Sequence, residues 1–173
     1  MERGPVIIYT GHGKGKTTSA LGMALDFWAR GGSVLVLQFI KGGWHYGELA
    51  AVAALGPRFT IRQAGLGFVR FADPEEKALH REAARQALAE AERSLGHYDL
   101  VVLDEVIYAV GYSLLTVGEV AELVRNRPPR VTLVLTGRNA PDELAGLADS
   151  VVEAVEVRHH ARAGVRSVKG IEF

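Results

Sequence analysis

The sequence contains no cysteine, which excludes disulfides, thiolate-bound metal sites and cysteine nucleophiles. No apolar run approaches the roughly 20 residues that a membrane-spanning helix needs, and the opening "MERGPVIIYT" lacks the long apolar segment of a secretory signal. Charge of neither sign is in excess, because 20 basic residues balance 20 acidic ones. A neutral balance argues against binding to duplex nucleic acid. We therefore expect a cytoplasmic protein with no membrane or nucleic-acid partner.

The remaining composition is that of an ordinary globular protein, with 48% hydrophobic and 23% charged residues. The chain has 173 residues and shows no internal repeat, low-complexity segment or linker. A chain of this length suits one domain with a substantial core. We expect residues 1–173 to form a single domain.

Short β-branched runs alternate with longer helical stretches along the chain. Strands are expected at 6–10, 33–39, 58–63, 100–105, 131–138 and 150–157, the last of them as a core strand. Helices are expected from Thr17, from the Asp73-Pro74 start signal and from the capping box at Thr116. This alternation predicts an α/β fold with a mostly parallel β-sheet and helices on both faces. Ligands of such sheets bind at the carboxyl ends of the strands.

The stretch "YTGHGKGKTTSALG" (9–22) resembles the phosphate-binding motif G-x-x-x-x-G-K-[ST]. Gly15, Lys16 and Thr17 fill the last three positions, whereas Thr10 replaces the first glycine. Glycines let backbone N–H groups approach phosphate oxygens, and the following helix adds its positive end. Lys16 supplies a charge, and the Thr17 hydroxyl suits Mg²⁺. A glycine-rich turn without a ligand is the alternative, which the order of strand, loop and helix disfavours.

Two further loop residues allow more than one interpretation. Lys14 is either a second phosphate contact or a solvated side chain. His12 suits a backbone-shaped position better than the role of an acid or a base. Gly11 and Gly13 lie inside the loop, where they favour close approach of the backbone to an anion.

Three side chains follow later strands and are expected at the same edge of the sheet. Asp104 and Glu105 end an apolar run, where a carboxylate holds Mg²⁺ directly or through water, or instead caps a helix. We favour the metal because the phosphate loop is present. Arg138 in "LTGR" either binds phosphate or pairs with an acid.

Aromatic residues in the loop-rich stretches 40–48 and 64–73, Phe68 among them, indicate a binding surface. Near the end, Arg158-His159-His160 suits contact with phosphate or a partner, or a plain surface position, better than metal binding. No N-K-x-D motif is present, which argues against a GTPase, and no arginine-rich lid of the small-kinase type is evident.

Together these motifs resemble the ATP:corrinoid adenosyltransferases of the cobalamin pathway, over nearly the whole chain. The matching segments occur in the family's order: "TGHGKGKTTSALGMAL", "VLQFIKG", "YDLVVLDE", "LTGRNAP", "LADSVVE" and "GIEF". The resemblance implies a RecA-like P-loop fold, a homodimer, and a separate reductase that supplies Co(I). It implies transfer of the 5′-deoxyadenosyl group of ATP to a reduced corrinoid, with triphosphate as the leaving group and with ATP reversed along the loop.

The resemblance also assigns residues to roles. Residues 11–18, from Gly11 to Thr18, would grip the triphosphate, and Thr17 with Asp104 or Glu105 would hold Mg²⁺. Lys16, Thr17 and Glu105 are the expected catalytic residues, and Arg138 is expected to contact the nucleotide. Phe68 would pack against the corrinoid.

The chain departs from the family at two places, and two other functions stay open beside the one that the resemblance implies. Arg70 stands where members have a tryptophan, and Arg158-His159 stands where members often have Lys-His. One alternative is a protein that holds ATP and a corrinoid for delivery with little turnover. Another is a phosphotransferase or ATPase, which would release ADP.

Overall fold

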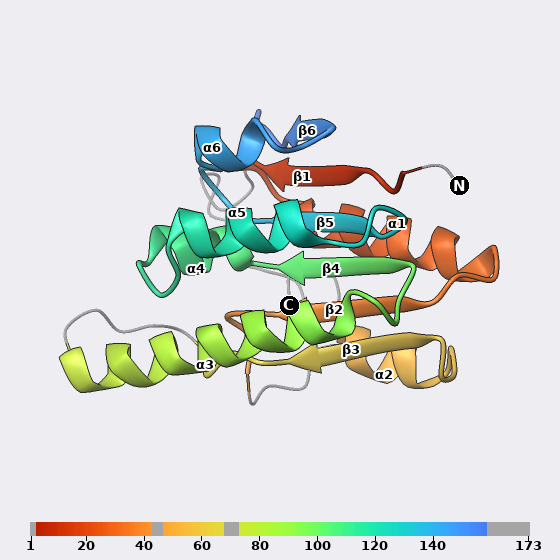
Figure 1. Cartoon of the computed structure of the whole chain (residues 1–173), viewed down its shortest axis with the longest axis horizontal. Coiled ribbons are helices and arrows are strands. Elements are labelled where there is room, and N and C mark those ends of the chain that lie inside the picture. Colours follow the sequence, from red (N-terminus) through yellow and green to blue (C-terminus); the bar gives the residue numbers. More distant parts are fainter. Residues whose placement is uncertain (1–2, 43–46, 68–72, 159–173) are drawn as a thin grey trace.

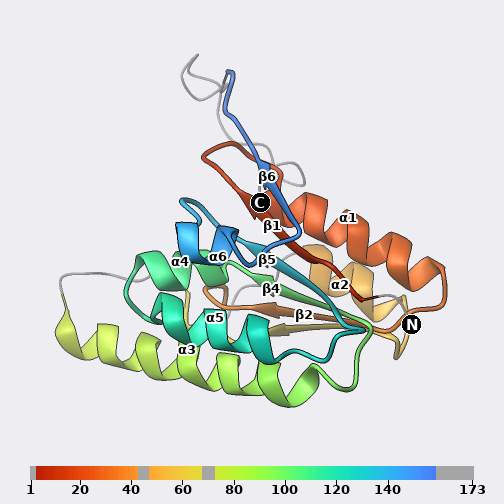
Figure 2. The ribbon, with the colours of Figure 1, turned by 45° about the horizontal axis from the view of Figure 1, so that its top comes forward.

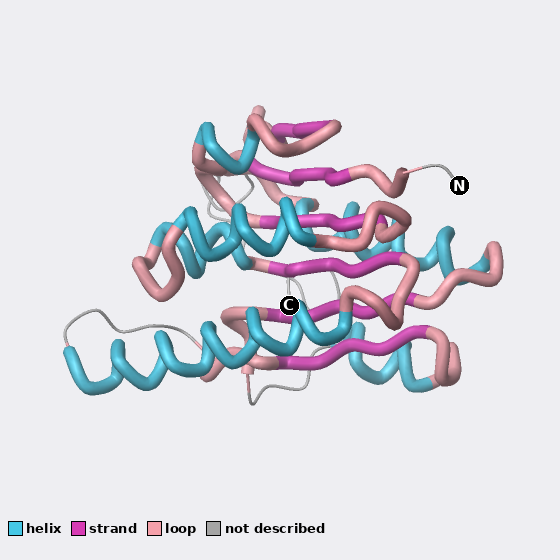
Figure 3. Tube along the Cα trace, in the orientation of Figure 1, coloured by secondary structure: helices cyan, strands magenta, loops and turns pink. Residues whose placement is uncertain are grey.

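The structure is a computed structural model that describes residues 3–42, 47–67 and 73–158. One six-stranded sheet runs through the molecule, drawn in magenta in Figure 3. Its strands stand in the order β3-β2-β4-β5-β1-β6 (Figure 1), and all its strand pairs are parallel. The strands are β1 (Val6–Thr10), β2 (Val34–Gln38), β3 (Phe59–Gln63), β4 (Leu100–Asp104), β5 (Thr132–Thr136) and β6 (Ser150–Glu153). The expected α/β architecture with a parallel sheet is confirmed, and it is consistent with a RecA-like P-loop fold.

Helices cover both faces of the sheet (Figure 2). One face carries α1 (Lys16–Ala29) and α2 (Gly47–Ala53), and the other carries α3 (Pro74–Ser94), α4 (Val106–Gly111), α5 (Val117–Asn126) and α6 (Asp142–Ala145). Within the described residues, no helix combines the length and the apolar character that crossing a bilayer requires.

Two apolar clusters, one on each face, form the core. In β2, Leu35 and Leu37 belong to the cluster under α3 to α6, whereas Val34 and Val36 belong to the cluster under α1. All four side chains are fully buried. Because successive side chains of a strand point to opposite faces, a strand covered on both sides must be apolar throughout. The continuous apolar runs of the sequence have this origin.

The strongest helix signals in the sequence are confirmed. The Asp73 side chain accepts hydrogen bonds from the backbone N–H groups of Glu75 and Glu76, and Thr116 and Glu119 form the expected capping box. The short helices α2, α4 and α6 were not predicted from the sequence. α2 begins at Gly47, so the loop expected over residues 40–48 is shorter than predicted.

The prediction that 150–157 is a core strand is wrong. β6 covers only Ser150–Glu153, lies at the edge of the sheet beside β1, and is exposed at every position. Val151 and Val152 are each 45% exposed. Valine favours extended backbone whether or not its side chain is buried, so the β-branched pattern indicates a strand but not its depth.

Candidate functional site

The phosphate loop lies between β1 and α1, and its conformation depends on glycine. Gly11 and Gly15 have φ values of 92° and 102°, which side-chain-bearing residues rarely adopt. Behind the loop, the Gly13 N–H donates to Ala154 O at 2.7 Å. A Cβ on Gly11 would lie 2.4 Å from Ala154 O, so the chain after β6 leaves no room for a side chain there.

Thr10, the residue that replaces the motif's first glycine, has a structural task. Its hydroxyl oxygen accepts a hydrogen bond from the Ala140 N–H at 3.1 Å. The neighbouring Tyr9 carbonyl accepts from the Gly137 N–H at 3.1 Å. These two contacts tie the start of the phosphate loop to the loop after β5, which carries Arg138.

The N-terminus of α1 is suited to binding an anion. Gly15 is the N-cap residue and no side chain caps the helix. The first N–H groups of a helix have no partner within the helix and carry its positive end. A phosphate at such a terminus satisfies both features.

Lys16 and Arg138 are two cations near this helix terminus. The Lys16 ammonium donates to Gly11 O at 2.8 Å and to Gly13 O at 2.6 Å, so it lies folded against the loop. Burial lowers the pKa of Lys16, the charge of Arg138 lowers it further, and the charge of Glu105 opposes both effects. An anion bound near both side chains would offset the repulsion between their like charges.

Asp104 is the centre of the hydrogen bonds at this edge of the sheet, and it is fully buried. Its Oδ1 atom accepts from the Thr17 hydroxyl at 2.8 Å and from the Thr136 hydroxyl at 2.7 Å. Its Oδ2 atom accepts from Gln38 Nε2 at 3.3 Å and lies 4.0 Å from Lys41 Nζ. The alternative interpretation of the sequence required Asp104 to cap a helix. Asp104 does not cap α4, whose N-cap residue is Glu105.

Glu105 has a backbone conformation that is unusual for its residue type. It is the N-cap residue of α4 with φ 63° and ψ 16°, and its side chain makes no capping hydrogen bond. The Glu105 N–H donates to the Thr136 hydroxyl at 2.9 Å. A non-glycine residue in this region costs on the order of 1 kcal/mol or more, and such residues cluster at functional sites.

Arg138 is exposed on the loop after β5, and its guanidinium lies 5.9 Å from the centroid of the Tyr108 ring. It also lines a hollow of about 470 Å³ together with His12 and residues 153–156. The hollow lies directly beside the phosphate loop. Lys14 and Thr18 are exposed on the loop and the first turn of α1.

The described parts of the two loop-rich stretches after β2 and β3 lie against each other. The Gly65 N–H donates to Lys41 O at 3.1 Å, and the Gly67 N–H donates to Ile40 O at 2.9 Å. Phe68 follows directly but lies outside the described residues, as do Arg70, His159 and His160. The prediction about Phe68 therefore stays a prediction.

The structure thus brings Lys16, Thr17, Asp104, Glu105 and Arg138 to one edge of the sheet. Sequence reasoning missed three residues that join them: Gln38, Lys41 and Thr136. The sequence did contain a signal for Gln38 and Thr136, because β2, β4 and β5 each end in a polar residue after an apolar run. Within the described residues, no group of three or more His, Cys, Asp or Glu side chains could hold a metal ion.

Comparison with known proteins gives matches over nearly the whole chain. A family model described as ATP:corrinoid adenosyltransferase BtuR/CobO/CobP matches residues 2–173. The corrinoid adenosyltransferase of Escherichia coli K12 is 37% identical over 174 residues, which cover 99% of this chain and 87% of the relative. The corrinoid adenosyltransferase CobA of Salmonella typhimurium is 36% identical over the same shares. The corrinoid adenosyltransferase of Pseudomonas aeruginosa is 35% identical, covering 99% of this chain and 85% of the relative.

Proposed function

The chain belongs to the ATP:corrinoid adenosyltransferase family, and from this premise we propose that its phosphate loop grips the triphosphate of ATP as a leaving group. ATP and a reduced corrinoid are the substrates. The Co(I) centre attacks the 5′ carbon of ATP, a cobalt–carbon bond forms, and the carbon–oxygen bond to the triphosphate breaks. The electron pair of that bond leaves with the triphosphate.

In this reaction, the protein's main contribution is to neutralise the negative charge of the leaving triphosphate. The triphosphate carries a high negative charge as it leaves, and preorganised donors stabilise such charge best. The uncapped N-terminus of α1, Lys16 and Arg138 together provide these donors. We propose that Lys16 exchanges its contacts with Gly11 O and Gly13 O for contacts with phosphate. Lys14, His12 and Thr18 border the same anion.

The residues around Thr17 fit a magnesium ion. Mg²⁺ prefers hard oxygen ligands and usually keeps several waters. Because the Thr17 hydroxyl donates its proton to Asp104 Oδ1, its lone pairs are left for a cation. We propose that Thr17 holds the ion, that Asp104 fixes Thr17, and that Glu105 contributes from beside them. The ion would supply positive charge to the triphosphate.

No general base is needed in this scheme, because Co(I) is itself a strong nucleophile. The protein positions the 5′ carbon against the cobalt and excludes competing geometries. We propose that Phe68 packs against the corrinoid. The described part of its loop supports this, since Gly65 and Gly67 hold it beside the loop after β2, where Lys41 approaches Asp104.

The proposed adenosyl transfer consumes Co(I) and does not itself produce it. We propose a separate reductase as a partner, a homodimer as the assembly, and the cytoplasm, where ATP and reducing power are both available, as the location. These three proposals extend the family resemblance.

The observation that carries the proposal is the meeting of an uncapped helix terminus, two cations and the Thr17–Asp104 pair in a chain that matches the family over its full length.

The test uses purified protein, ATP, Mg²⁺ and a chemically reduced corrinoid without oxygen. The visible spectrum should change to that of a light-sensitive adenosylcorrinoid over many turnovers. Adenosine in place of ATP should give no product. Product limited to one equivalent would instead indicate a binding and delivery protein.

A further inference from the structure

Three neighbouring parallel strands end in polar residues that stand in one row. Gln63 of β3 is the register partner of Gln38 of β2, and Gln38 is the register partner of Asp104 of β4. Gln63 Nε2 donates to Gln38 Oε1 at 3.3 Å, and Gln38 Nε2 donates to Asp104 Oδ2 at 3.3 Å. Gln38 is fully buried, whereas Gln63 at the edge strand is half-buried.

The chemistry of the groups fixes the direction of these hydrogen bonds. A carboxylate only accepts, so Gln38 must turn its NH₂ group toward Asp104 and its oxygen toward Gln63. Gln63 must then present its own NH₂ group. Only one arrangement therefore gives a donor and an acceptor at both contacts, and reversal of either amide would leave two acceptors facing each other.

We propose that Gln38 is a positioning residue for the proposed magnesium site, a role that rests on the function proposed above. Gln38 holds Oδ2 of Asp104 on the β2 side of the carboxylate. The other oxygen, Oδ1, then stays on the hydroxyls of Thr17 and Thr136. Thr17 in turn keeps its lone pairs turned toward the triphosphate.

A charged group also acts on the Asp104 oxygen that Gln38 contacts. Lys41 Nζ lies 4.0 Å from the same oxygen, Oδ2 of Asp104. In a protein lacking the Gln38 amide, the ammonium would attract Oδ2 and rotate the carboxylate. Rotation would weaken the hydrogen bond from the Thr17 hydroxyl to Asp104 Oδ1. That hydrogen bond orients Thr17, the proposed ligand of the magnesium ion.

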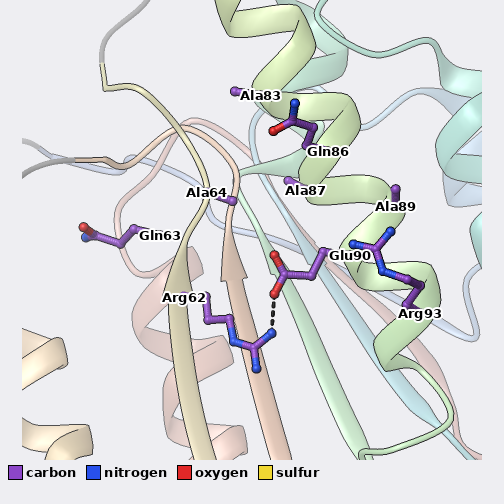
Figure 4. A pocket seen from close by; sticks show the side chains of 9 residues that line it. All are labelled: Arg62, Gln63, Ala64, Ala83, Gln86, Ala87, Ala89, Glu90 and Arg93. Carbon is purple, nitrogen blue, oxygen red and sulfur yellow. Dashed lines mark hydrogen bonds and ion pairs between the residues drawn. The ribbon is translucent and has the colours of Figure 1, made fainter.

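Gln63 lines a hollow beside β3, but its side chain hydrogen-bonds Gln38. The hollow, of about 540 Å³, separates β3 from α3. In Figure 4 the Gln63 side chain points away from the α3 residues, while Arg62 turns to an ion pair with Glu90. The alternation of β3 also puts Gln63 on the same face as Phe59, which packs in the cluster under α1.

The experiment measures ATP binding by calorimetry, once with Mg²⁺ and once with a chelator, in the wild type and in Gln38→Met. Methionine has a similar length and no hydrogen-bonding amide. Residues that orient metal ligands typically contribute about 10–100-fold in metal affinity. We expect the strengthening of ATP binding by Mg²⁺ to fall by about 10-fold or more in Gln38→Met. Metal-free ATP affinity should stay unchanged, because the loop and Lys16 are intact.

Two further variants make the result decisive. Gln63→Met should also reduce the strengthening of ATP binding by Mg²⁺, but by less than Gln38→Met does. If Gln38→Met does not fold, the Gln63→Met result is the test of the proposal. Gln86→Met is the matched control, since Gln86 is exposed, lines the same hollow and bonds only Glu82 among the contacts described. It should behave as the wild type.

Equal losses of ATP affinity with and without Mg²⁺ would reveal a merely structural role and overturn the proposal. So would a wild type whose ATP binding does not respond to Mg²⁺. Adenosyl transfer is scored separately in the wild type. If the Mg²⁺ effect depends on Gln38 but no adenosylcorrinoid forms, the proposed function fails and the positioning role stands.

Discussion

Thr136 joins the two acidic residues of the site through a single hydroxyl. The hydroxyl donates to Asp104 Oδ1 at 2.7 Å and accepts from the Glu105 N–H at 2.9 Å, and Thr136 is 1% exposed. Thr136→Val keeps the shape of the side chain and removes both hydrogen bonds. A lost hydrogen bond to a charged group costs about 1.5–3 kcal/mol, and an orphaned buried N–H costs about 1–3 kcal/mol.

We expect Thr136→Val to lower the free energy of unfolding by about 3 kcal/mol, because burial of the new methyl group offsets part of the two losses. For a chain of this size, that corresponds to a fall in Tm of about 6–12 °C. Urea unfolding without ATP measures the effect. Thr132→Val is the matched control: Thr132 is buried at the other end of β5, on the same face of the sheet. A Thr136→Val protein no less stable than Thr132→Val would refute the assigned role of the hydroxyl.

Three further changes test other parts of the account. Lys16→Ala should abolish turnover with the fold intact, since loss of a well-placed charge costs on the order of 3 kcal/mol or more in the transition state; near-normal activity would remove the loop from the mechanism. Phe68→Ala should harm the corrinoid step and leave ATP binding by calorimetry little changed; loss of ATP affinity would instead assign Phe68 to the nucleotide pocket or the core. Hydrogen bonds from the Ser33 backbone and side chain lower the pKa of Asp99. Their stabilisation is therefore present above the ordinary aspartate pKa and lost as pH falls through the lowered one. Asp99→Asn should flatten the acid limb of a stability–pH curve, and an unchanged limb would contradict this.

Local signals explain which parts of the fold could be predicted from sequence. The glycine-rich loop between a strand and a helix, the Asp73 cap and the Thr116 capping box each depend on residues close together in the chain, and all three are found as expected. The helices α2, α4 and α6 have only seven, six and four residues. Such lengths are too short for a helical period to be visible. The exposed edge position of β6 depends on strand order, which its own residues do not encode.

The site divides in the same way. That Lys16, Thr17 and Asp104 lie together could be predicted, because the motif is local and Asp104 ends an apolar strand near that motif; their roles stay predictions. Gln38 and Thr136 were not predicted, since their importance comes from register across the sheet. A glutamine or threonine at the end of one strand does not by itself indicate a functional site. Polar residues at the ends of four neighbouring strands do indicate one.

Phosphorus NMR of a turnover reaction tests most directly the central claim that ATP is bound through its triphosphate as the leaving group. The reaction contains the protein, ATP, Mg²⁺ and a chemically reduced corrinoid, and adenosylcorrinoid is measured in the same sample. We predict that triphosphate accumulates in step with adenosylcorrinoid and that little ADP forms. ADP and phosphate rising in proportion to turnover would contradict the account and favour an ATPase or phosphotransferase.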